Sequence, residues 1–353
     1  MKISILTFSK EDNNGANLQC YALVETLKEM GHDVDIIDIQ LSVVNYGLFN
    51  RLLHYPQHLN YVRFRKRYLN CFTKSFHDVA ELTDCLPKSD LYIVGSDQVW
   101  NLDITKRLDP LIYFFSFLPS ESRRMAYAAS FGVSDWIWNQ WTPRVSKLLA
   151  KFDAISVREI QGAEICKKTF GLKAEVVCDP TFLLPSYDHI CGTYTPTRAT
   201  NNIVYFKFIR SSEIEKLLLH EAKKLKLNVV KLGDFHPRVN CGFKPYYSVE
   251  GWLNNIRYAH FVLTDSFHCM VFCILFNKPF ISMPGAEGRS SRMISLLKSL
   301  NLYNRFCHDV KELQDRFSVL YETPIDYASV NQKIAEMRRQ GRNFLKASIS
   351  NIL

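Results

Sequence analysis

The sequence predicts an α/β protein of two doubly wound domains, and three observations carry that prediction. The chain has 353 residues, 47% of them hydrophobic, which is too long for one typical core. Short β-branched and aromatic runs alternate with longer helical patterns, as in βα units with mainly parallel strands. Residues 185–202 interrupt this alternation with an aperiodic stretch rich in Thr, Pro and Asn, which predicts a linker.

The first predicted domain spans residues 1–184 and begins with the strand sequence ISILTF. Its strands are expected at Ile3–Phe8, Val34–Ile39, Leu91–Val94, Met125–Ala129, Ala154–Val157 and Glu175–Val177. Its helices are expected at Leu18–Met30, Trp136–Ala150 and Glu159–Phe170. Residues 41–77 form a basic, aromatic insertion in this series.

The second predicted domain spans residues 203–330 and is followed by a C-terminal helix within 331–353. Its strands are expected at Ile203–Phe208, Val229–Leu232, Phe261–Thr264 and Pro279–Met283. Its helices are expected at Ser211–Leu225, Val249–Ile256, Ser266–Phe276 and Ser290–Leu300, with the terminal helix at Asn331–Leu345. Because doubly wound sheets bind ligands beyond the carboxyl ends of their strands, we expect the two domains to face each other across a cleft.

The charge and the missing motifs narrow the chemistry. The formal net charge of +9 favours an anionic partner, which could be a phosphorylated metabolite, a nucleic acid or an anionic lipid surface. The first strand is not followed by GxGxxG, and GxxxxGK[ST], HExxH and GxSxG are absent from the sequence. Dehydrogenases, P-loop ATPases, zinc proteases and common serine hydrolases are therefore disfavoured.

The ten cysteines are expected to be reduced thiols in a cytoplasm. The opening MKISILTF has the pattern of a buried strand and lacks the charged start, long apolar run and cleavage site of a signal peptide. Cys269 and Cys273 lie in the run CMVFCILF, where cysteine serves as a small buried hydrophobe, so no metal site is expected. That run is also too short to span a bilayer.

Polar side chains follow the predicted strands of the first domain. Asn14, Gly15, Asn17 and Gln19 open the first helix, where free N–H groups favour a polar or anionic ligand, although a plain helix cap explains them equally well. The segment GSDQVWN, residues 95–101, follows the strand at Leu91–Val94 and suits a polyol such as a sugar, or else a simple turn. It brings Ser96, Asp97, Gln98 and Asn101 into the candidate site, and Ser130 follows the next strand.

Charged groups mark three further junctions. Arg158, in SVRE, could clamp a carboxylate or phosphate through its planar guanidinium, or form a surface pair with Glu159. His268, in TDSFH, lies in the first turn of an apolar helix, where it could transfer a proton near neutral pH or be a buried structural histidine. The glycine-rich segment 285–292 carries Arg289 and Arg292 and suits an anion.

The basic insertion has no acidic residue between Asp38 and Asp78. It interleaves eight aromatic residues with six cations, which are Arg51, Arg63, Arg65, Lys66, Arg67 and Lys74. This mixture suits a peripheral contact with an anionic membrane, a nucleic-acid groove or a lid over an anionic substrate. The alternative is a helical insertion with packed aromatics and solvated charges.

As an ordered set, six of these segments resemble the polysaccharide pyruvyl transferase family. They are residues 14–23 (NGANLQCYAL), 95–101 (GSDQVWN), 127–132 (YAASFG), 156–159 (SVRE), 179–184 (DPTFLL) and 264–268 (TDSFH). The resemblance implies a GT-B-like pair of Rossmann-type domains. It also implies transfer of pyruvate from phosphoenolpyruvate to two sugar hydroxyls, giving a cyclic ketal and phosphate, with no metal or nucleotide as a necessary cofactor.

The resemblance also implies roles for single residues. Arg158 and His268 match the family's donor site, but Ser266 stands where the family has an arginine. Because phosphoenolpyruvate carries a carboxylate and a phosphate, we expect Lys207, Arg289 or Arg292 to supply the missing cation. His268 would act as general acid, and Asp97 would orient or deprotonate the sugar hydroxyl.

The expected acceptor is a sugar, carried on a polyprenyl diphosphate in the assembly of a surface or capsular polysaccharide, with the basic insertion near the inner face of the membrane. A GT-B-type glycosyltransferase using a sugar nucleotide is the alternative enzyme. A non-catalytic scaffold or nucleic-acid-binding protein is the third class. Because an electrostatic surface would need none of these polar strand ends, no nucleic-acid partner is expected.

Overall fold

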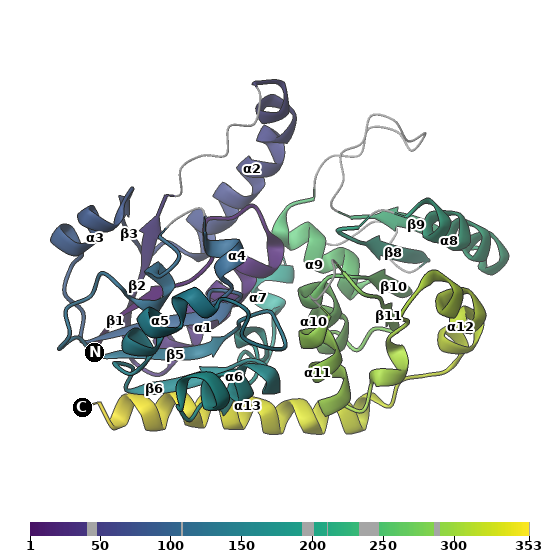
Figure 1. Cartoon of the computed structure of the whole chain (residues 1–353). Helices are drawn as coiled ribbons and strands as arrows, with labels where there is room; N and C mark the ends of the chain where they lie inside the picture. Colours follow the sequence, from purple (N-terminus) through teal and green to yellow (C-terminus); the bar gives the residue numbers. More distant parts are fainter. Residues whose placement is uncertain are drawn as a thin grey trace. The chain divides into compact units, whose positions relative to one another are not determined.

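The computed structural model describes residues 1–40, 48–106, 109–192, 201–209, 211–232, 247–285 and 290–352, with the backbone alone for 48–53. The chain divides into two compact units (Figure 1). Unit 1 comprises Met1–Leu48, Arg65–Pro185 and Ile334–Leu353, and unit 2 comprises Phe49–Phe64 and Ser186–Lys333. Each unit contains one parallel sheet with helices, so the predicted α/β class is confirmed.

The sheet of unit 1 has seven parallel strands in the order β3-β2-β1-β4-β5-β6-β7. The strands are β1 (Lys2–Leu6), β2 (Asp33–Ile39), β3 (Phe72–Phe76), β4 (Leu91–Asp97), β5 (Arg124–Ala129), β6 (Ala154–Val157) and β7 (Glu175–Val176). The order reverses between β1 and β4, because β2 and β3 extend to one side of β1 and the later strands to the other. Doubly wound sheets bind ligands at this point, beyond the carboxyl ends of the strands.

Most helices of unit 1 start where local sequence provides a side-chain cap or a proline. They are α1 (Asn14–Glu29), α3 (Val79–Cys85), α4 (Leu102–Thr105), α5 (Thr142–Leu149) and α6 (Ile160–Phe170), and α2 (Leu48–Tyr68) is divided between the units. The side chain of Asn13 accepts the N–H of Ala16, so α1 begins earlier than predicted. Helix α5 begins later than predicted because Pro143 occupies its first turn.

The core of unit 1 is apolar and aromatic. Ile3 and Ile5 of β1 and Val94 of β4 are inaccessible to solvent. Trp100 stacks on Phe114 with ring centroids 5.5 Å apart, and its indole N–H donates to the carbonyl of Tyr113. The six strands predicted for the first half are present, but β3 was missed because FTKSF carries polar residues that an edge strand tolerates.

The sheet of unit 2 has four parallel strands in the order β11-β10-β8-β9. They are β8 (Asn202–Phe206), β9 (Asn228–Lys231), β10 (Phe261–Thr264) and β11 (Phe280–Ser282), and they confirm the four strands predicted there. The helices are α7 (Asp188–Cys191), α8 (Ser212–Leu225), α9 (Val249–Arg257), α10 (Phe267–Leu275), α11 (Ser291–Ser299) and α12 (Val310–Glu322). The strand order reverses between β8 and β10. Short α7 lies within the stretch expected to be a linker, and α12 was not predicted.

The C-terminal helix α13 (Tyr327–Ser350) returns the chain to unit 1 from Ile334 onward. There Arg338 donates to the carbonyls of Phe182 and Leu184, at 2.7 and 3.1 Å. A side chain on Gly341 would meet the hydroxyl of Tyr127 at 2.6 Å, so glycine is needed for this close approach. Within the described ranges, no helix is both long and apolar enough to cross a bilayer.

Candidate functional site

The carboxyl end of β4 places Asp97 at the reversal of strand order in unit 1. Gly95 lets β4 approach β5 closely, because a Cβ at this position would lie 2.3 Å from the carbonyl oxygen of Tyr127. Asp97 then turns the chain out of the strand with φ of 73°, a left-handed conformation that is unusual for a non-glycine residue. Its carboxylate accepts the N–H of Gln98 at 2.9 Å. Backbone strain of this kind is concentrated at functional sites.

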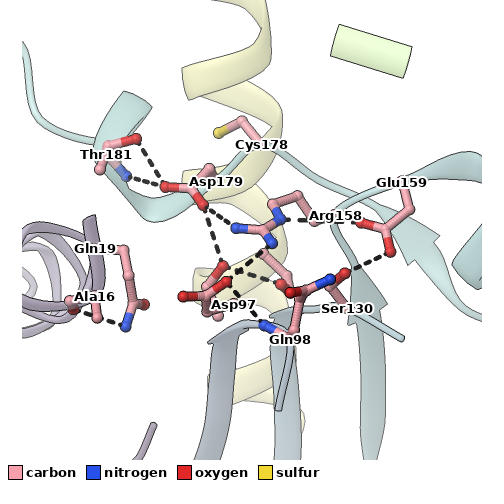
Figure 2. A network of polar contacts seen from close by, with 12 residues as sticks. Ala16, Gln19, Asp97, Gln98, Ser130, Arg158, Glu159, Cys178, Asp179 and Thr181 are labelled. Carbon is pink, nitrogen blue, oxygen red and sulfur yellow. Dashed lines mark hydrogen bonds and ion pairs between the residues drawn. The ribbon is translucent and has the colours of Figure 1, made fainter. Parts of the chain in front are cut away.

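Arg158 is the centre of a buried ion-pair network at the same edge (Figure 2). It leaves β6 and donates to Asp179 at 2.7 Å and to Asp97 at 3.3 Å. Its Nε lies 3.9 Å from Glu159, whose other oxygen accepts the hydroxyl of Ser130 at 2.6 Å. Burial alone would lower the pKa of Arg158, but these carboxylates outweigh it and raise the pKa.

Asp179 is the firmest partner of Arg158. One of its oxygens accepts both the N–H and the hydroxyl of Thr181, at 3.0 and 2.7 Å, and the hydroxyl of Ser96 lies 3.4 Å from the other. Asp179 belongs to the DPTFLL segment, and the sequence alone indicates no role for it. Three carboxylates therefore surround one guanidinium, and this edge has a surplus of negative charge that suits a neutral polyol better than an anion.

The remaining residues predicted for acceptor binding mostly have structural partners. Gln19 donates to the hydroxyl of Thr7 at 2.9 Å, and Asn17 donates to the carbonyls of Glu11 and Asn13. Asn101 caps α4 through the N–H groups of Asp103 and Ile104. Gly15 lies buried in the first turn of α1. Among these predicted residues, four buried amide atoms nevertheless have no hydrogen-bond partner in the described structure, and they are Asn14 Oδ1, Asn17 Oδ1, Gln19 Oε1 and Gln98 Nε2.

Glu11, which sequence analysis missed, lies in the loop between β1 and α1. Its Oε2 is buried and accepts no hydrogen bond within the described residues. Burial, together with the charge of Asp97, raises the pKa of Glu11 to about 7, against the opposing effect of Arg65 and backbone N–H groups. In the sequence, Glu11 is recognisable only as an acidic residue that follows the first strand. Its burial could not be predicted, because the residues that bury it are distant in the chain.

In unit 2, Lys207 and Asp265 lie at the reversal of strand order. Lys207 follows β8 and Asp265 follows β10, and their side chains are buried with the charged atoms 3.9 Å apart. Asp265 accepts the N–H groups of Phe208 and Ile209, at 2.7 and 3.0 Å, and thereby holds the loop after β8. Burial lowers the pKa of Lys207 and raises that of Asp265, with each charge partly offsetting the effect on the other.

His268 occupies the first turn of α10 and is buried, with 7% of its surface exposed. Its ring meets that of Phe267 edge to face, with centroids 5.2 Å apart. The guanidinium of Arg292 lies over the same Phe267 ring, 5.3 Å from its centre. Ser266 is the N-cap of α10 and accepts the N–H of Cys269. Arg289 lies outside the described residues.

The basic insertion divides into residues with different roles. Arg65 is buried and donates to the carbonyls of Lys10 and Glu11, so it fixes the loop after β1. Arg63, Lys66 and Arg67 are exposed on α2. Residues 41–47 and the side chain of Arg51 lie outside the described structure. In the described ranges, no group of three or more His, Cys, Asp or Glu side chains is arranged to hold a metal ion.

A sequence model of the polysaccharide pyruvyl transferase family matches residues 13–285. This is more than half of the chain. The chain belongs to the polysaccharide pyruvyl transferase family. The match confirms the resemblance seen in the ordered segments, and it spans the polar strand ends of both units. Among curated proteins, no relative matches the sequence.

Solved structures with a similar fold are sugar-nucleotide enzymes of the GT-B type. The UDP-GlcNAc 2-epimerase of Neisseria meningitidis bound to UDP-GlcNAc has a TM-score of 0.59 and 10% identity, covering 99% of this chain and 100% of that one. MnaA of S. aureus with UDP has a TM-score of 0.59 and 11% identity, covering 100% and 97%. An alpha-glucosyltransferase with UDP has a TM-score of 0.51 and 11% identity, covering 98% and 95%. At these identities the likeness concerns the fold alone, and it confirms the GT-B-like prediction.

Proposed function

We propose that this chain transfers pyruvate from phosphoenolpyruvate to two hydroxyls of a sugar, giving a cyclic ketal and phosphate in the synthesis of a surface polysaccharide. The observation that carries the proposal is the family match across residues 13–285. Its support in the fold is that the family segments GSDQVWN and TDSFH follow β4 and β10, where strand order reverses in each sheet. Doubly wound sheets bind their ligands there.

The donor is assigned to unit 2 on grounds of charge. Lys207, Arg292 and the N-terminus of α10 supply positive charge near the carboxyl ends of β8 and β10. Phosphoenolpyruvate carries a carboxylate and a phosphate, and both need such partners when they leave water. Lys207 and Arg292 thus replace the family arginine that is Ser266 here, while Ser266 keeps its role as helix cap.

The acceptor is assigned to unit 1. Asp97 and the amides around it offer hydrogen-bond donors and acceptors without a free positive charge, which suits neutral hydroxyls. Arg158 has its two terminal nitrogens on Asp179 and Asp97, so in this proposal it positions Asp97 instead of clamping the donor. This differs from the donor role that the family resemblance implies for Arg158.

The reaction is balanced in protons and bonds. One hydroxyl oxygen adds to C2 of phosphoenolpyruvate and loses its proton to a base at the acceptor site, while His268 donates a proton to C3, which becomes the methyl group. Solvent later carries the proton from that base back to His268. The bond from C2 to the phosphate oxygen then breaks, and the second hydroxyl adds to C2 and gives its proton to the departing phosphate. Asp97 orients the first hydroxyl. No metal or nucleotide takes part in these steps.

The test is phosphate release from phosphoenolpyruvate with polyprenyl-diphosphate-linked glycans as acceptors. Turnover that requires both substrates, with a product heavier than the acceptor by one pyruvate ketal, supports the proposal. Absence of release with every acceptor, from protein that is folded by circular dichroism, contradicts it. A panel of 4-nitrophenyl hexopyranosides serves as a soluble set of acceptors with free hydroxyl pairs.

A sugar-nucleotide glycosyltransferase is the second candidate, and one observation favours it. Similar folds are found with UDP or UDP-GlcNAc bound, and Ser266 leaves this chain without the family arginine. Calorimetric titration separates the two functions, because the pyruvyl transferase binds phosphoenolpyruvate and the glycosyltransferase binds uridine diphosphate. Binding of uridine diphosphate alone would replace the first proposal by the second.

A further inference from the structure

Glu11 is the acidic group of unit 1 that the proposed function leaves without a role. It follows β1, beside the strand β4 that carries Asp97, at the reversal of strand order. Its backbone is fixed from two elements, because Asn17 of α1 donates to the Glu11 carbonyl at 2.9 Å and Arg65 of α2 donates to it at 3.3 Å. Arg65 also holds the neighbouring carbonyl of Lys10 at 3.2 Å. The loop that presents Glu11 is therefore anchored before any ligand binds.

The electrostatic surroundings of Glu11 come from four elements. Asp97 of β4 is the nearby negative charge, and Arg65 of α2 is the opposing positive charge. Cys20 of α1 and Tyr113 of the 3-10 turn Ile112–Phe114 also face it, and burial with the charge of Glu11 raises the pKa of both. Both groups stay neutral at ordinary pH, so among the described residues Asp97 and Arg65 are the main charges that act on Glu11.

Glu11 and Asp97 are neighbouring carboxylates with different partners. Asp97 accepts from the guanidinium of Arg158 and from the N–H of Gln98, so a proton on Asp97 would have to compete with both contacts. Glu11 has one buried oxygen without a partner in the described structure, and its pKa is raised to about 7 by burial and by Asp97. Two carboxylates whose environments separate them in this way take different roles in acid–base catalysis.

Three buried amides at the same edge indicate what kind of molecule binds beside Glu11. Asn17 and Gln19 are inaccessible to solvent and Gln98 is 6% exposed, yet each has one polar atom without a partner in the described residues. Two of these atoms are acceptors and one is a donor. A buried polar atom without a partner costs about 1–3 kcal/mol, so a ligand that completes these bonds is favoured. Sugar hydroxyls can donate and accept at once.

We propose that Glu11 is the general base that takes the proton from the acceptor hydroxyl, while Asp97 positions that hydroxyl. The inference rests on the proposed ketal transfer and assigns the base that this reaction needs. The O–H bond of the hydroxyl breaks, its oxygen forms the bond to C2 of phosphoenolpyruvate, and the proton moves to the Glu11 carboxylate. The general acid protonates C3, and after turnover solvent carries the proton from Glu11 back to the acid.

The decisive variant is Glu11→Gln, which keeps the shape of the side chain and removes its basicity. Phosphate release is measured with phosphoenolpyruvate and the 4-nitrophenyl hexopyranosides between pH 5 and 9. The wild type should gain kcat as pH rises through about 7, because the base must be ionised. The variant should have a kcat that is lower by roughly 100- to 10,000-fold and that no longer rises with pH through about 7. Its KM for phosphoenolpyruvate should stay within about threefold of the wild-type value.

Two further variants separate catalysis from structure. Glu25→Gln makes the same change at a glutamate of α1 that pairs with Lys28, and it should leave kcat and the pH profile unchanged. Glu11→Asp keeps a carboxylate, but its shorter side chain places that carboxylate farther from the hydroxyl. This variant should therefore keep the rise of kcat with pH, at a reduced kcat.

The outcomes distinguish the inference from the function on which it rests. If the wild type turns over and Glu11→Gln retains kcat within about threefold, the role of Glu11 is wrong and the pyruvyl transfer stands. The role of Glu11 is also wrong if kcat of the Glu11→Gln variant still rises with pH as it does in the wild type. If the folded wild type releases no phosphate with any acceptor, the proposed function fails and the role of Glu11 fails with it.

Discussion

The two units use the same structural plan for opposite electrostatic environments. In each, polar side chains lie where the strand order of a parallel sheet reverses. In unit 1 the carboxylates of Asp97, Asp179 and Glu159 outnumber the single guanidinium of Arg158. In unit 2 a buried lysine, Lys207, is paired with one aspartate, and the guanidinium of Arg292 lies over the ring of Phe267, in the first turn of α10. The fold therefore supplies the place for a ligand, while side-chain charge selects its class.

The largest expected effect is on unit 2. His268→Ala should lower kcat for ketal formation by roughly 100- to 10,000-fold, because it removes the general acid. The variant should still fold, which its circular dichroism spectrum checks. His220→Ala, an exposed histidine on α8 of the same unit, is the matched control and should keep full activity. Full activity of His268→Ala would remove the proposed role of His268.

The next effect compares the buried ion pairs of the two units. Asp179→Asn should lower the free energy of unfolding by about 3–5 kcal/mol, because Arg158 cannot lose its proton and remains buried with a partner removed. Asp265→Asn should cost less, about 1–2 kcal/mol, because burial already lowers the pKa of Lys207 and the lysine can become neutral. Urea denaturation measures both, and equal losses would contradict the comparison.

A third prediction concerns the pH dependence of stability. The pKa of Glu11 is raised from 4.5 to about 7 on folding, so its stabilising contribution is present below pH 4.5 and is lost as pH rises through 7. Glu11→Gln lacks this loss. Relative to the wild type, the variant should therefore gain up to about 3 kcal/mol between pH 4.5 and pH 8, measured by denaturant unfolding at each pH. A constant difference across that range would mean that Glu11 titrates normally.

The smallest effect concerns a membrane contact of α2. We propose that Arg63, Lys66 and Arg67, which are exposed, attract an anionic surface at about 1 kcal/mol per cation. Replacing all three by Gln should abolish salt-sensitive binding to vesicles containing phosphatidylglycerol, measured by sedimentation at low salt. Lys167, Lys168 and Lys173, changed to Gln together, make a control with the same loss of charge. Arg65 is left intact because it anchors the Glu11 loop. Absence of binding by the wild type would contradict this contact.

The sequence by itself determined the fold class, the strands of both sheets except β3, and the family. These features depend on local patterns, since alternation of apolar residues and short polar motifs are readable within a few residues. The family segments also named Asp97, Arg158 and His268 as candidates. Asp97 and Arg158 lie in the ion-pair network of unit 1. The structure adds Asp179 to that network, a residue for which the sequence indicated no role.

Only the tertiary structure decided what these residues can do. Arg158 was an available cation in the sequence, but folding surrounds it with carboxylates from β4, its own junction and the DPTFLL segment. Arg65 belonged to a basic stretch, yet its side chain turns inward and fixes a loop 54 residues away along the chain. Glu11 carried no motif at all. Charge, burial and pKa depend on neighbours that are distant in sequence, and a one-dimensional pattern contains no information on which of them meet.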